Sequence, residues 1–528
     1  MKSSPARPGG SLPPTGPIVS SRVRAAVVVG SIALVALGGV ACGGAGKRGR
    51  AVDSAVWIDG ATVPLSNSDV ARLEAGGVTE VFVDAARVEW RGSQPQLAPQ
   101  PLPKTPRRVR ATLVIRGGWP TGVDDAEAAA KALATSLEAV ARSAEEAGLG
   151  VSGWHLDFAG LPGKDGGELA QELRDVLEPN LLLSATVPRD ALATEGLDEV
   201  LAATDFIVSF LYGNREGEPE EVATGDFKQI EEAARKIEEL EEPFLVGVVV
   251  RGAASVLRNG QDAGEIPGAT LQALAWNRKL RIRHGFSLEG IDRQVYAFTV
   301  DSPTRIVDTR VYPGDNVRVV CTSTAHMQEL RRLIASWKLE HHLGQLYYRL
   351  PHVGDGLTLT ADSLARIGAE ATALPDPRII VTKLAESPGR VVVKLSLHNA
   401  SSEGSDLSQV DSNLVEMWAV GGAFGDVRPG EFYRYDVYMA GPDGKLVRTI
   451  RYPTVLRLFA PLLPAGGTIE TGPIEVRTVR GGLADLQVRA TFIAPYGGTA
   501  EIKPTSWMQL QPAPIPTPTP EPKPERRR

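Results

Sequence analysis

Cysteine is almost absent from this sequence, which contains only Cys42 and Cys321 among 528 residues. The count leaves no disulfide framework, so the stability of the fold has to come from core packing. There is no C-x-x-C pair for redox chemistry. Cysteine and histidine also do not cluster at metal-ligand spacing, because His341 and His342 are adjacent and face different ways. We therefore expect neither a metal ion nor a cofactor.

The sequence also lacks a Gly-rich phosphate loop and a G-x-S-x-G nucleophile elbow, the common nucleotide-binding and serine-hydrolase motifs. Positive charge is in short supply as well, since the formal net charge is −6. The acidic runs Glu216 to Glu221 and Glu238 to Glu242 have the composition of solvated surface. A nucleic-acid partner is not expected, because it would need a basic face.

A chain of 528 residues, 43% of them hydrophobic, is too long for one ordinary core and predicts two or three domains. Both ends are rich in proline, over Met1 to Ser21 and over Pro512 to Arg528, which reads PAPIPTPTPEPKPERRR. Such segments are typical of extended tails. We do not expect either end to fold.

The N-terminal region has the layout of a bacterial export signal. Two arginines precede the uncharged run Ala25 to Ala41, and Cys42 follows it. The small residues before the cysteine resemble the lipobox of bacterial lipoproteins, which implies cleavage after residue 41 and a lipid on Cys42. Gly39 departs from that motif, where a large aliphatic residue is usual. The alternative is an uncleaved membrane anchor, because the run is near the lower limit of about 17 residues for a span.

From residue 55 to 375 short apolar runs alternate with helical patterns, which is typical of β/α units on a parallel sheet. Eight runs of this kind predict a closed (β/α)8 TIM-like barrel, and residues 42 to 54 would then link it to the anchor. The predicted strands are Ala55 to Asp59, Glu80 to Val88, Arg110 to Arg116, Val151 to Phe158, Leu181 to Val187, Asp205 to Tyr212, Phe244 to Val250 and Gly344 to Leu350.

Amphipathic helices are expected between the strands, at Asp124 to Ala147, at Phe227 to Leu240 and at Ser363 to Glu370. Two units depart from the repeat. The run Arg91 to Arg107 has too many prolines for a helix and predicts a loop. The stretch from about 252 to 323 is too long for a turn and predicts an insertion containing a strand pair. It leaves from a strand end where barrel active sites are built, so it is either a lid or a decoration.

After Pro375 the helical periodicity ends, and residues 376 to 511 predict a β-sandwich of the Ig-like kind. The expected strands are Arg378 to Lys383, Arg390 to His398, Phe432 to Ala440, Leu446 to Tyr452, Gly467 to Glu475 and Leu486 to Ile493. Residues 512 to 528 form the Pro-rich tail beyond this domain.

The segment Val151 to Ala159, VSGWHLDFA, carries the strongest hint of chemistry. His155 and Asp157 alternate with apolar neighbours, so on a strand they point to one side, and a barrel mouth requires that side to be the inner one. An inward carboxylate needs a partner or a task, because burying a lone charge is costly.

This strand resembles the catalytic strand of the chitinase-like glycoside hydrolases of family eighteen, which ends D-G-x-D-x-D-x-E. Gly153 and Asp157 fill the glycine and the last aspartate of that motif, and Ala159 stands where the proton-donating glutamate would be. The segment Ser209 to Asn214 is similar to the M-x-Y-D strand of the same family. Tyr212 matches the tyrosine that contacts the substrate there, and a glycine replaces the aspartate.

Glycoside hydrolysis generally needs two carboxylic groups, or one acid with help from the substrate. The candidate catalytic residues are Asp157 and, from the second strand, Glu89 or Asp84. The alternative is that Asp157 forms a structural ion pair with Arg116 or Arg251.

Candidate substrate-binding residues are Trp119, Trp154, His155, Tyr212 and Asn214, which fall at or just past strand ends. Flat aromatic rings there can stack on sugars, and they can equally fill the core. His155 has the further alternative of a hydrogen-bonded interior residue rather than a base.

The combination of export signal, degenerate barrel and trailing sandwich resembles a family of uncharacterised bacterial lipoproteins. The resemblance implies a role with carbohydrate or cell-envelope material. One hypothesis is a membrane-anchored protein that binds a glycan or peptidoglycan in the barrel mouth, with hydrolysis left open. The other is an envelope scaffold with an inert barrel, in which the sandwich docks an unidentified protein.

Overall fold

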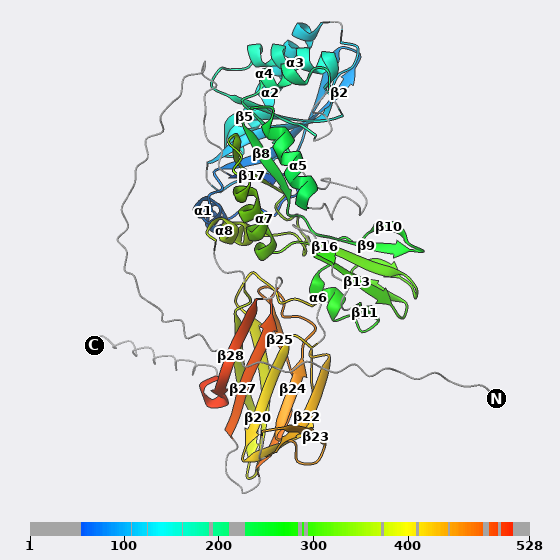
Figure 1. Ribbon diagram of the computed structural model, residues 1–528, viewed down its shortest axis with the longest axis vertical. Helices are drawn as coiled ribbons and strands as arrows, with labels where there is room; N and C mark the ends of the chain where they lie inside the picture. The colour runs from blue at the N-terminus through cyan, green and yellow to red at the C-terminus, as the bar shows by residue number, and fades with distance from the viewer. Residues whose placement is uncertain are drawn as a thin grey trace, which may run out of the picture. The chain divides into compact units, whose positions relative to one another are not determined.

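The computed structural model describes residues 54 to 510 (Figure 1) apart from 107, 124, 161, 189–193, 211–226, 284–287, 290–293, 371–373, 408–410, 442–443, 479–484 and 495–497. The export segment, Cys42, the following linker and the Pro-rich tail lie outside the described residues. No described helix is long and apolar enough to cross a membrane.

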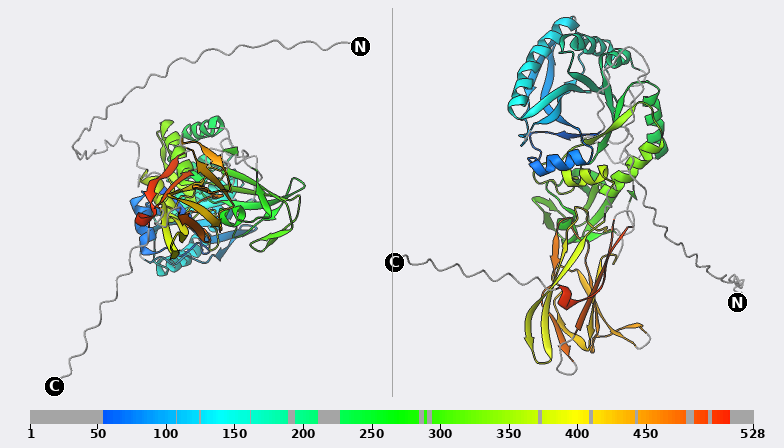
Figure 2. Two further views of the ribbon diagram at one scale, coloured as in Figure 1. Left: turned by 90° about the horizontal axis from the view of Figure 1, so that it is seen from below. Right: turned by 90° about the vertical axis from the view of Figure 1, so that its left-hand side faces the viewer.

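Eight parallel strands close into a barrel, as the sequence predicts. Each strand pairs in parallel with the next, and β1 completes the ring by pairing with both β17 and β2. The right-hand view of Figure 2 shows helices around the strands. The barrel strands are β1 (Ser54–Ile58), β2 (Glu80–Arg91), β4 (Val109–Gly118), β5 (Leu149–Ala159), β6 (Leu182–Thr186), β7 (Phe206–Ser209), β8 (Phe244–Val249) and β17 (His342–Tyr348).

Alternation along the strands divides the apolar side chains into two cores. Trp57, Phe82 and Tyr348 belong to the cluster inside the barrel. A second and larger cluster fills the layer between strands and helices, and it includes Trp154 and Leu156. The barrel interior is therefore packed, and polar side chains are admitted mainly at its two ends.

Several of the barrel helices begin at side chains that cap them. Asp125 caps α2 by accepting from the Ala128 amide at 2.9 Å, and Thr360 caps α8. The helices predicted around residues 124, 227 and 363 are all confirmed. The described helices of the barrel are α1 (Asn67–Ala75), α2 (Ala126–Glu146), α3 (Gly163–Val176), α4 (Leu197–Ala203), α5 (Phe227–Glu238), α7 (Thr324–Ser336) and α8 (Ala361–Gly368).

The second β/α unit lacks its helix, as the prolines predict, but it holds a strand rather than a plain loop. The strand β3 (Gln94–Pro99) pairs antiparallel with the end of β2. The register of β2 against β4 shifts between Asp84 and Ala86, which is the signature of a bulge. Beyond this bulge β2 still pairs with β4 at Ala86 and Arg87, and its last part forms one arm of a hairpin with β3.

A second antiparallel sheet forms between β8 and β17. The two strands expected there are confirmed, since β13 and β16 pair antiparallel over six residue pairs from Gln294↔Cys321 to Thr299↔Asn316. This inserted region consists of β9 (Ala253–Arg258), β10 (Gln261–Glu265), α6 (Leu271–Ala275), β11 (Leu280–Ile282), β12 (Leu288–Glu289), β13 (Gln294–Val300), β14 (Thr304–Ile306), β15 (Thr309–Val311) and β16 (Asn316–Cys321).

Two further antiparallel sheets enclose one apolar core and form the predicted β-sandwich. One sheet consists of β18 (Pro377–Ser387), β19 (Arg390–Asn399), β21 (Gly422–Val427), β25 (Thr468–Glu470) and β26 (Ile474–Thr478). The other consists of β20 (Leu414–Val420), β22 (Arg434–Ala440), β23 (Leu446–Arg448), β24 (Val455–Phe459), β27 (Asp485–Ile493) and β28 (Thr499–Ser506), and the 3-10 turn η4 (Trp507–Leu510) follows. Five of the six predicted segments each correspond to one strand, whereas Gly467 to Glu475 is divided between β25 and the start of β26; β20, β21, β24 and β28 are additional.

Candidate functional site

The polar group of the barrel mouth starts on β5. His155 lies inside the barrel with no exposed surface, and its ring meets the rings of Trp57 and Phe82 edge to face. Asp157, two residues further, points to the same side at the carboxyl end of the strand. The alternation read from the sequence therefore places both residues as expected.

Asp157 is held by two neighbours. The Thr186 hydroxyl donates to Asp157 Oδ1 at 2.9 Å, and Arg116 Nε lies 3.8 Å from Asp157 Oδ2. The Asp157 side chain retains 9% of its exposure. Of the two arginine partners considered from the sequence, Arg116 is the one in ion-pair range, whereas Arg251 pairs with Glu265 at 2.6 Å.

Arg116 serves a second carboxylate at the same time. Its Nε lies 3.0 Å from Asp84 Oδ2, and its Nη2 donates to the Tyr348 hydroxyl at 3.1 Å. The register explains the meeting, because Arg116 is the β4 partner of Asp157 on β5. One guanidinium therefore stands between two acids contributed by the strands on either side of it.

Burial and neighbouring charges together leave the pKa values of Asp84 and Arg116 raised. Burial raises the pKa of Asp84, and the charge of Arg116 offsets only part of the rise. Burial alone would lower the pKa of Arg116, but Tyr348, Asp84 and Asp157 together hold it above its usual value. Asp84 Oδ1 accepts no hydrogen bond within the described part of the chain. That oxygen is an acceptor without a donor at the barrel mouth.

His155 lies below this cluster and positions it. Its Nδ1 lies 2.9 Å from Ser184 Oγ, and its Nε2 lies 2.9 Å from Thr186 Oγ1. Because the Thr186 hydroxyl gives its only proton to Asp157, it has to accept from Nε2. The His155 ring therefore carries its proton on Nε2. It fixes the orientation of Asp157 through Thr186 and does not transfer a proton to it. This favours the reading of His155 as a hydrogen-bonded interior residue.

Two further ion pairs lie on the rim where β1 and β17 end. His352 Nε2 lies 2.7 Å from Asp59 Oδ2, and Arg349 Nη1 lies 2.9 Å from Asp355 Oδ2. Burial raises the pKa of Asp59, but the hydrogen bond and charge of His352 outweigh it, so the pKa is lowered overall. A cavity of about 420 Å³ adjoins this rim and is lined in part by His352 and Asp355.

The remaining candidates do not join the cluster. Trp154 is only 2% exposed and packs between strands and helices, as its position opposite Asp157 in the alternation implies. Trp119 packs against Phe158 and against Gly166 of α3. Glu89 lies on the exposed β2–β3 hairpin, opposite Gln96. Tyr212 and Asn214 lie outside the described residues.

Three residues of the cluster escaped the sequence reasoning, namely Trp57, Thr186 and Tyr348. Tyr348 and Trp57 could have been found, because each ends a predicted strand on its inward side. Thr186 required knowledge of which strand neighbours β5. The described residues contain no group of three or more His, Cys, Asp or Glu side chains that could hold a metal ion.

No family model matches the sequence, and no curated protein matches it either. Solved structures do. The spore cortex-lytic enzyme SleL of Bacillus cereus is 18% identical, with 61% of this chain and 74% of that chain covered, at a TM-score of 0.39. A glycoside hydrolase family 18 N-acetylglucosaminidase from Paenibacillus barengoltzii is 12% identical, with 60% of this chain and 99% of that one covered, at 0.38.

A class V chitinase from Nicotiana tobaccum is 14% identical over 60% of this chain and 98% of its own, with a TM-score of 0.39. The structural neighbours are thus chitinase-like and cortex-lytic enzymes. The closed eight-stranded barrel of the present chain is established by its own strand pairing rather than by these scores.

Proposed function

We propose that this chain is an exported, lipid-anchored envelope protein whose barrel binds a glycan at its carboxyl-terminal face without hydrolysing it. The observation that carries the proposal is Arg116, which lies within ion-pair distance of both Asp84 and Asp157. These are the two carboxylates that reach the mouth from β2 and β5.

The surroundings of Asp84 and Asp157 do not suit the two roles that hydrolysis requires. A general acid has to hold a proton, and a base or nucleophile has to offer a free oxygen. Arg116 favours the ionised form of both neighbours, the Thr186 hydroxyl donates to Asp157 Oδ1, and Arg116 Nε lies within ion-pair distance of Asp157 Oδ2. Burial acts in the opposite sense at Asp84, whose pKa stays raised. The position of the proton-donating glutamate in the similar chitinase strand is taken by Ala159, a methyl group at the end of β5.

Binding of a glycan requires hydrogen-bonding groups that a ligand can reach, and the barrel mouth has them. Arg116 and Asp84 keep 21% and 15% of their side-chain exposure, so a donor and an acceptor meet solvent side by side. Asp84 Oδ1 is buried and lacks a donor, so a sugar hydroxyl that supplies one has to insert into the mouth beside it. Barrel enzymes and binding proteins alike place their ligands at this face.

Anchoring of the protein to a membrane is part of the proposal, and the argument for it comes from the sequence. A lipid on Cys42 is supported by the uncharged run and the small residues before that cysteine. Growing cells with a fatty-acid analogue should label the wild-type protein and leave Cys42→Ser unlabelled. Label on the Cys42→Ser protein would contradict lipidation, and an intact N-terminus on the mature chain would favour the uncleaved anchor.

Ligand binding is tested by thermal unfolding with a panel of oligosaccharides and solubilised peptidoglycan fragments. A ligand of the native state raises the midpoint by linkage. We expect the rise to disappear in Asp84→Asn and to persist in Asp175→Asn, a control for the same chemical change on the exposed side of α3. Silence of the wild-type protein across the panel would favour the inert scaffold instead.

A further inference from the structure

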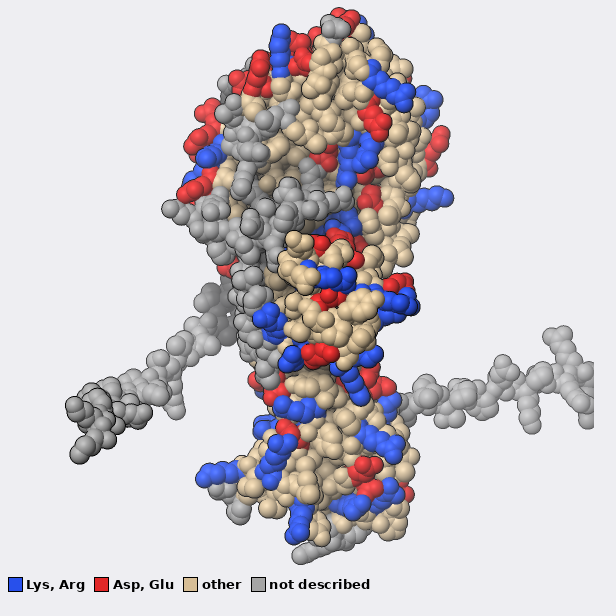
Figure 3. All heavy atoms as spheres, turned by 90° about the vertical axis from the view of Figure 1, so that its right-hand side faces the viewer, with Lys and Arg blue, Asp and Glu red and all other residues tan. Residues whose placement is uncertain are grey.

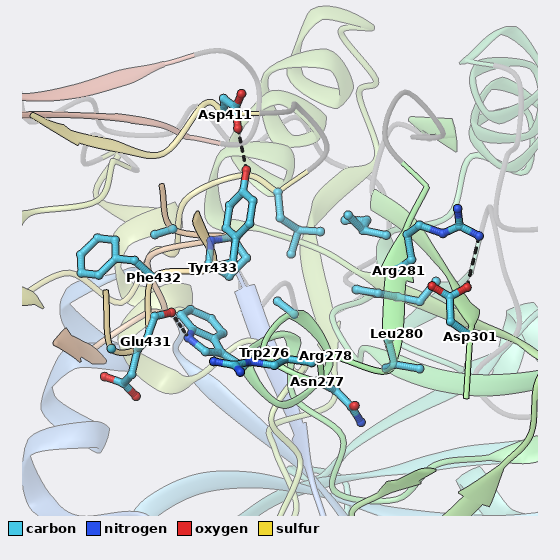
Figure 4. A pocket seen from close by; sticks show the side chains of 17 residues that line it. Trp276, Asn277, Arg278, Leu280, Arg281, Asp301, Asp411, Glu431, Phe432 and Tyr433 are labelled. Atoms are coloured by element: carbon cyan, nitrogen blue, oxygen red, sulfur yellow. Dashed lines mark hydrogen bonds and ion pairs between the residues drawn. The ribbon is translucent and has the colours of Figure 1, made fainter. Parts of the chain in front are cut away.

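A cavity of about 530 Å³ is lined by residues of the inserted region and of the sandwich, and by none of the barrel-mouth residues described above. Trp276, directly after α6, and Tyr433, directly before β22, contribute aromatic rings to it. In Figure 4 these two rings lie on one side of the space and the pair of Arg281 and Asp301 lies on the other. Its volume falls within the range of about 300 to 1,000 Å³ that is typical of small-molecule sites.

The aromatic side of this cavity is fixed by hydrogen bonds. Trp276 Nε1 donates to the Glu431 carbonyl oxygen at 2.7 Å, and the Tyr433 hydroxyl donates to Asp411 Oδ1 at 2.6 Å. Arg434 Nη2 holds the other oxygen of Asp411 at 2.6 Å. Both rings therefore have their polar ends engaged. Trp276 is half-buried and packs against the cores of the inserted sheet and the sandwich, and the Arg434 guanidinium lies 6.0 Å from the centre of the Tyr433 ring. Tyr433 is 52% exposed, so its face is accessible.

The opposite side of the cavity carries both positively charged hydrogen-bond donors and a negatively charged acceptor. Arg281 Nη2 lies 3.1 Å from Asp301 Oδ1, and both side chains are largely exposed. Arg278 also lines the cavity and has no carboxylate in ion-pair range within the described residues. A ligand that fits this lining has a flat apolar face on one side and several hydroxyl or amide groups on the other.

This chemistry separates the candidate ligands. An acyl chain would take the Arg281–Asp301 pair and Arg278 out of water without offering them a hydrogen bond, which is costly. A nucleotide or nucleic acid would need several cations for its phosphates. The face drawn in Figure 3 instead shows basic and acidic side chains intermixed over the described part of the inserted sheet and the sandwich. A sugar ring has an apolar face and a rim of hydroxyls and meets both demands.

We infer that the cavity between Trp276, Tyr433 and Arg281 is a second glycan-binding site. The inference rests on the proposed function, because it assigns the same class of ligand to a second place outside the barrel mouth. A polymer that reaches both sites is held more tightly than either site would hold it alone, through the high effective concentration of the second segment.

The test is calorimetric titration of the purified full chain with an N-acetylglucosamine tetramer and with solubilised peptidoglycan glycan strands. Wild-type protein should bind the tetramer at two independent sites. Removing the exposed ring in Tyr433→Ala should weaken one of them by roughly threefold to tenfold, the loss expected for one aromatic contact. Arg278→Ala should weaken the same site, because Arg278 also lines the cavity.

The matched control is Tyr435→Ala. Tyr435 is 40% exposed two residues further along the chain, on β22 and outside the cavity lining, so its removal should leave both sites unchanged. Arg116→Met should remove the barrel site alone.

The outcomes separate this inference from the proposed function. One site, lost in Arg116→Met and unaffected by Tyr433→Ala and Arg278→Ala, overturns the second site and leaves the barrel proposal standing. Binding that survives Arg116→Met and weakens in Tyr433→Ala overturns the barrel proposal and supports the second site. Failure of wild-type protein to bind either probe overturns both.

Discussion

The two ends of the barrel bury carboxylates in opposite ways. At the amino-terminal end, Glu80 is fully buried, lies 3.1 Å from Arg110, and accepts hydrogen bonds from the hydroxyls of Thr112 and Ser152. At the carboxyl-terminal end, Asp84 and Asp157 share Arg116. Glu80 and Asp84 belong to the same strand and the same inner face, four residues apart.

The difference indicates which end of the barrel stabilises the fold and which end can bind a ligand. Both hydroxyls donate to Glu80 Oε1, whereas Oε2 has only the charge of Arg110 beside it and, like Asp84 Oδ1, accepts no hydrogen bond within the described residues. The Glu80 side chain has no exposed surface, so it stabilises the fold and is closed to a ligand. The mouth has one cation for two acids and an oxygen, Asp84 Oδ1, without a donor. This shortage is where a ligand can contribute, in line with the placement of function at the carboxyl-terminal face of such barrels.

The largest expected effect is on the amino-terminal end. Glu80→Ala removes a buried charge and leaves Arg110 without its partner, which should lower the free energy of unfolding by about 3 to 5 kcal/mol. Chemical denaturation measures the loss. Glu89→Ala, on the exposed part of the same strand, should change it by less than about 0.5 kcal/mol. Equal effects of the two variants would remove the proposed distinction.

At the mouth, Arg116→Met should cost on the order of 2 kcal/mol at neutral pH, because two carboxylates then face each other without a cation. The loss should depend on pH. The repulsion makes the folded state hold a proton that the unfolded state releases, so the deficit shrinks as the pH falls toward the ordinary pKa of aspartate. Unfolding curves of variant and wild type from pH 4 to pH 8 measure this convergence, and a constant deficit would count against it.

A fourth carboxylate, Glu403, sharpens the comparison, because it is buried and has no Lys or Arg within ion-pair range among the described residues. Glu403 accepts from the Thr324 hydroxyl and, at 3.4 Å, from the Thr324 amide at the start of α7. Burial raises its pKa to about 7, although the Thr324 amide and the charge of Arg366 act in the opposite sense. The folded state therefore binds this proton more tightly than the unfolded state does.

It follows that the contribution of Glu403 to stability is present at low pH and is lost as the pH rises from about 4.5 to about 7. Glu403→Gln stays neutral throughout. We expect it to match the wild type near pH 4 and to be more stable by on the order of 1 to 3 kcal/mol at pH 8. Thermal or chemical unfolding at the two pH values decides this, and a variant less stable than wild type at pH 8 would refute it.

Much of the fold follows from the sequence because each barrel strand is an apolar run that ends at a turn. The strands of the sandwich are harder to predict from the sequence. Strands β20 and β24 carry Glu416 and Arg457 in their centres, which interrupts the apolar pattern. The two side chains are paired at 2.7 Å, and Glu416 has only 1% of its side-chain surface exposed. Only the pairing of the two strands reveals that these charges compensate each other inside a sheet.

The site divides in the same way. Alternation along β5 was sufficient to place His155 and Asp157 inside the barrel, and it also places Trp154 outside. The choice of Arg116 over Arg251 as the partner depends on register, including the shift between Ala111 and Thr112 that sets Arg116 opposite Asp157. Such a shift leaves no local mark in the sequence.

The smallest expected effect on stability and the most direct test of function meet in one experiment. Wild-type protein and Asp157→Asn are incubated with chitin oligosaccharides and solubilised peptidoglycan, and both the unfolding midpoint and the release of reducing ends are measured. We predict that the substitution changes the midpoint without ligand only slightly, that the wild type is stabilised by a ligand, and that neither protein releases reducing ends. Release by the wild type that disappears in Asp157→Asn would contradict the account and make the barrel a hydrolase.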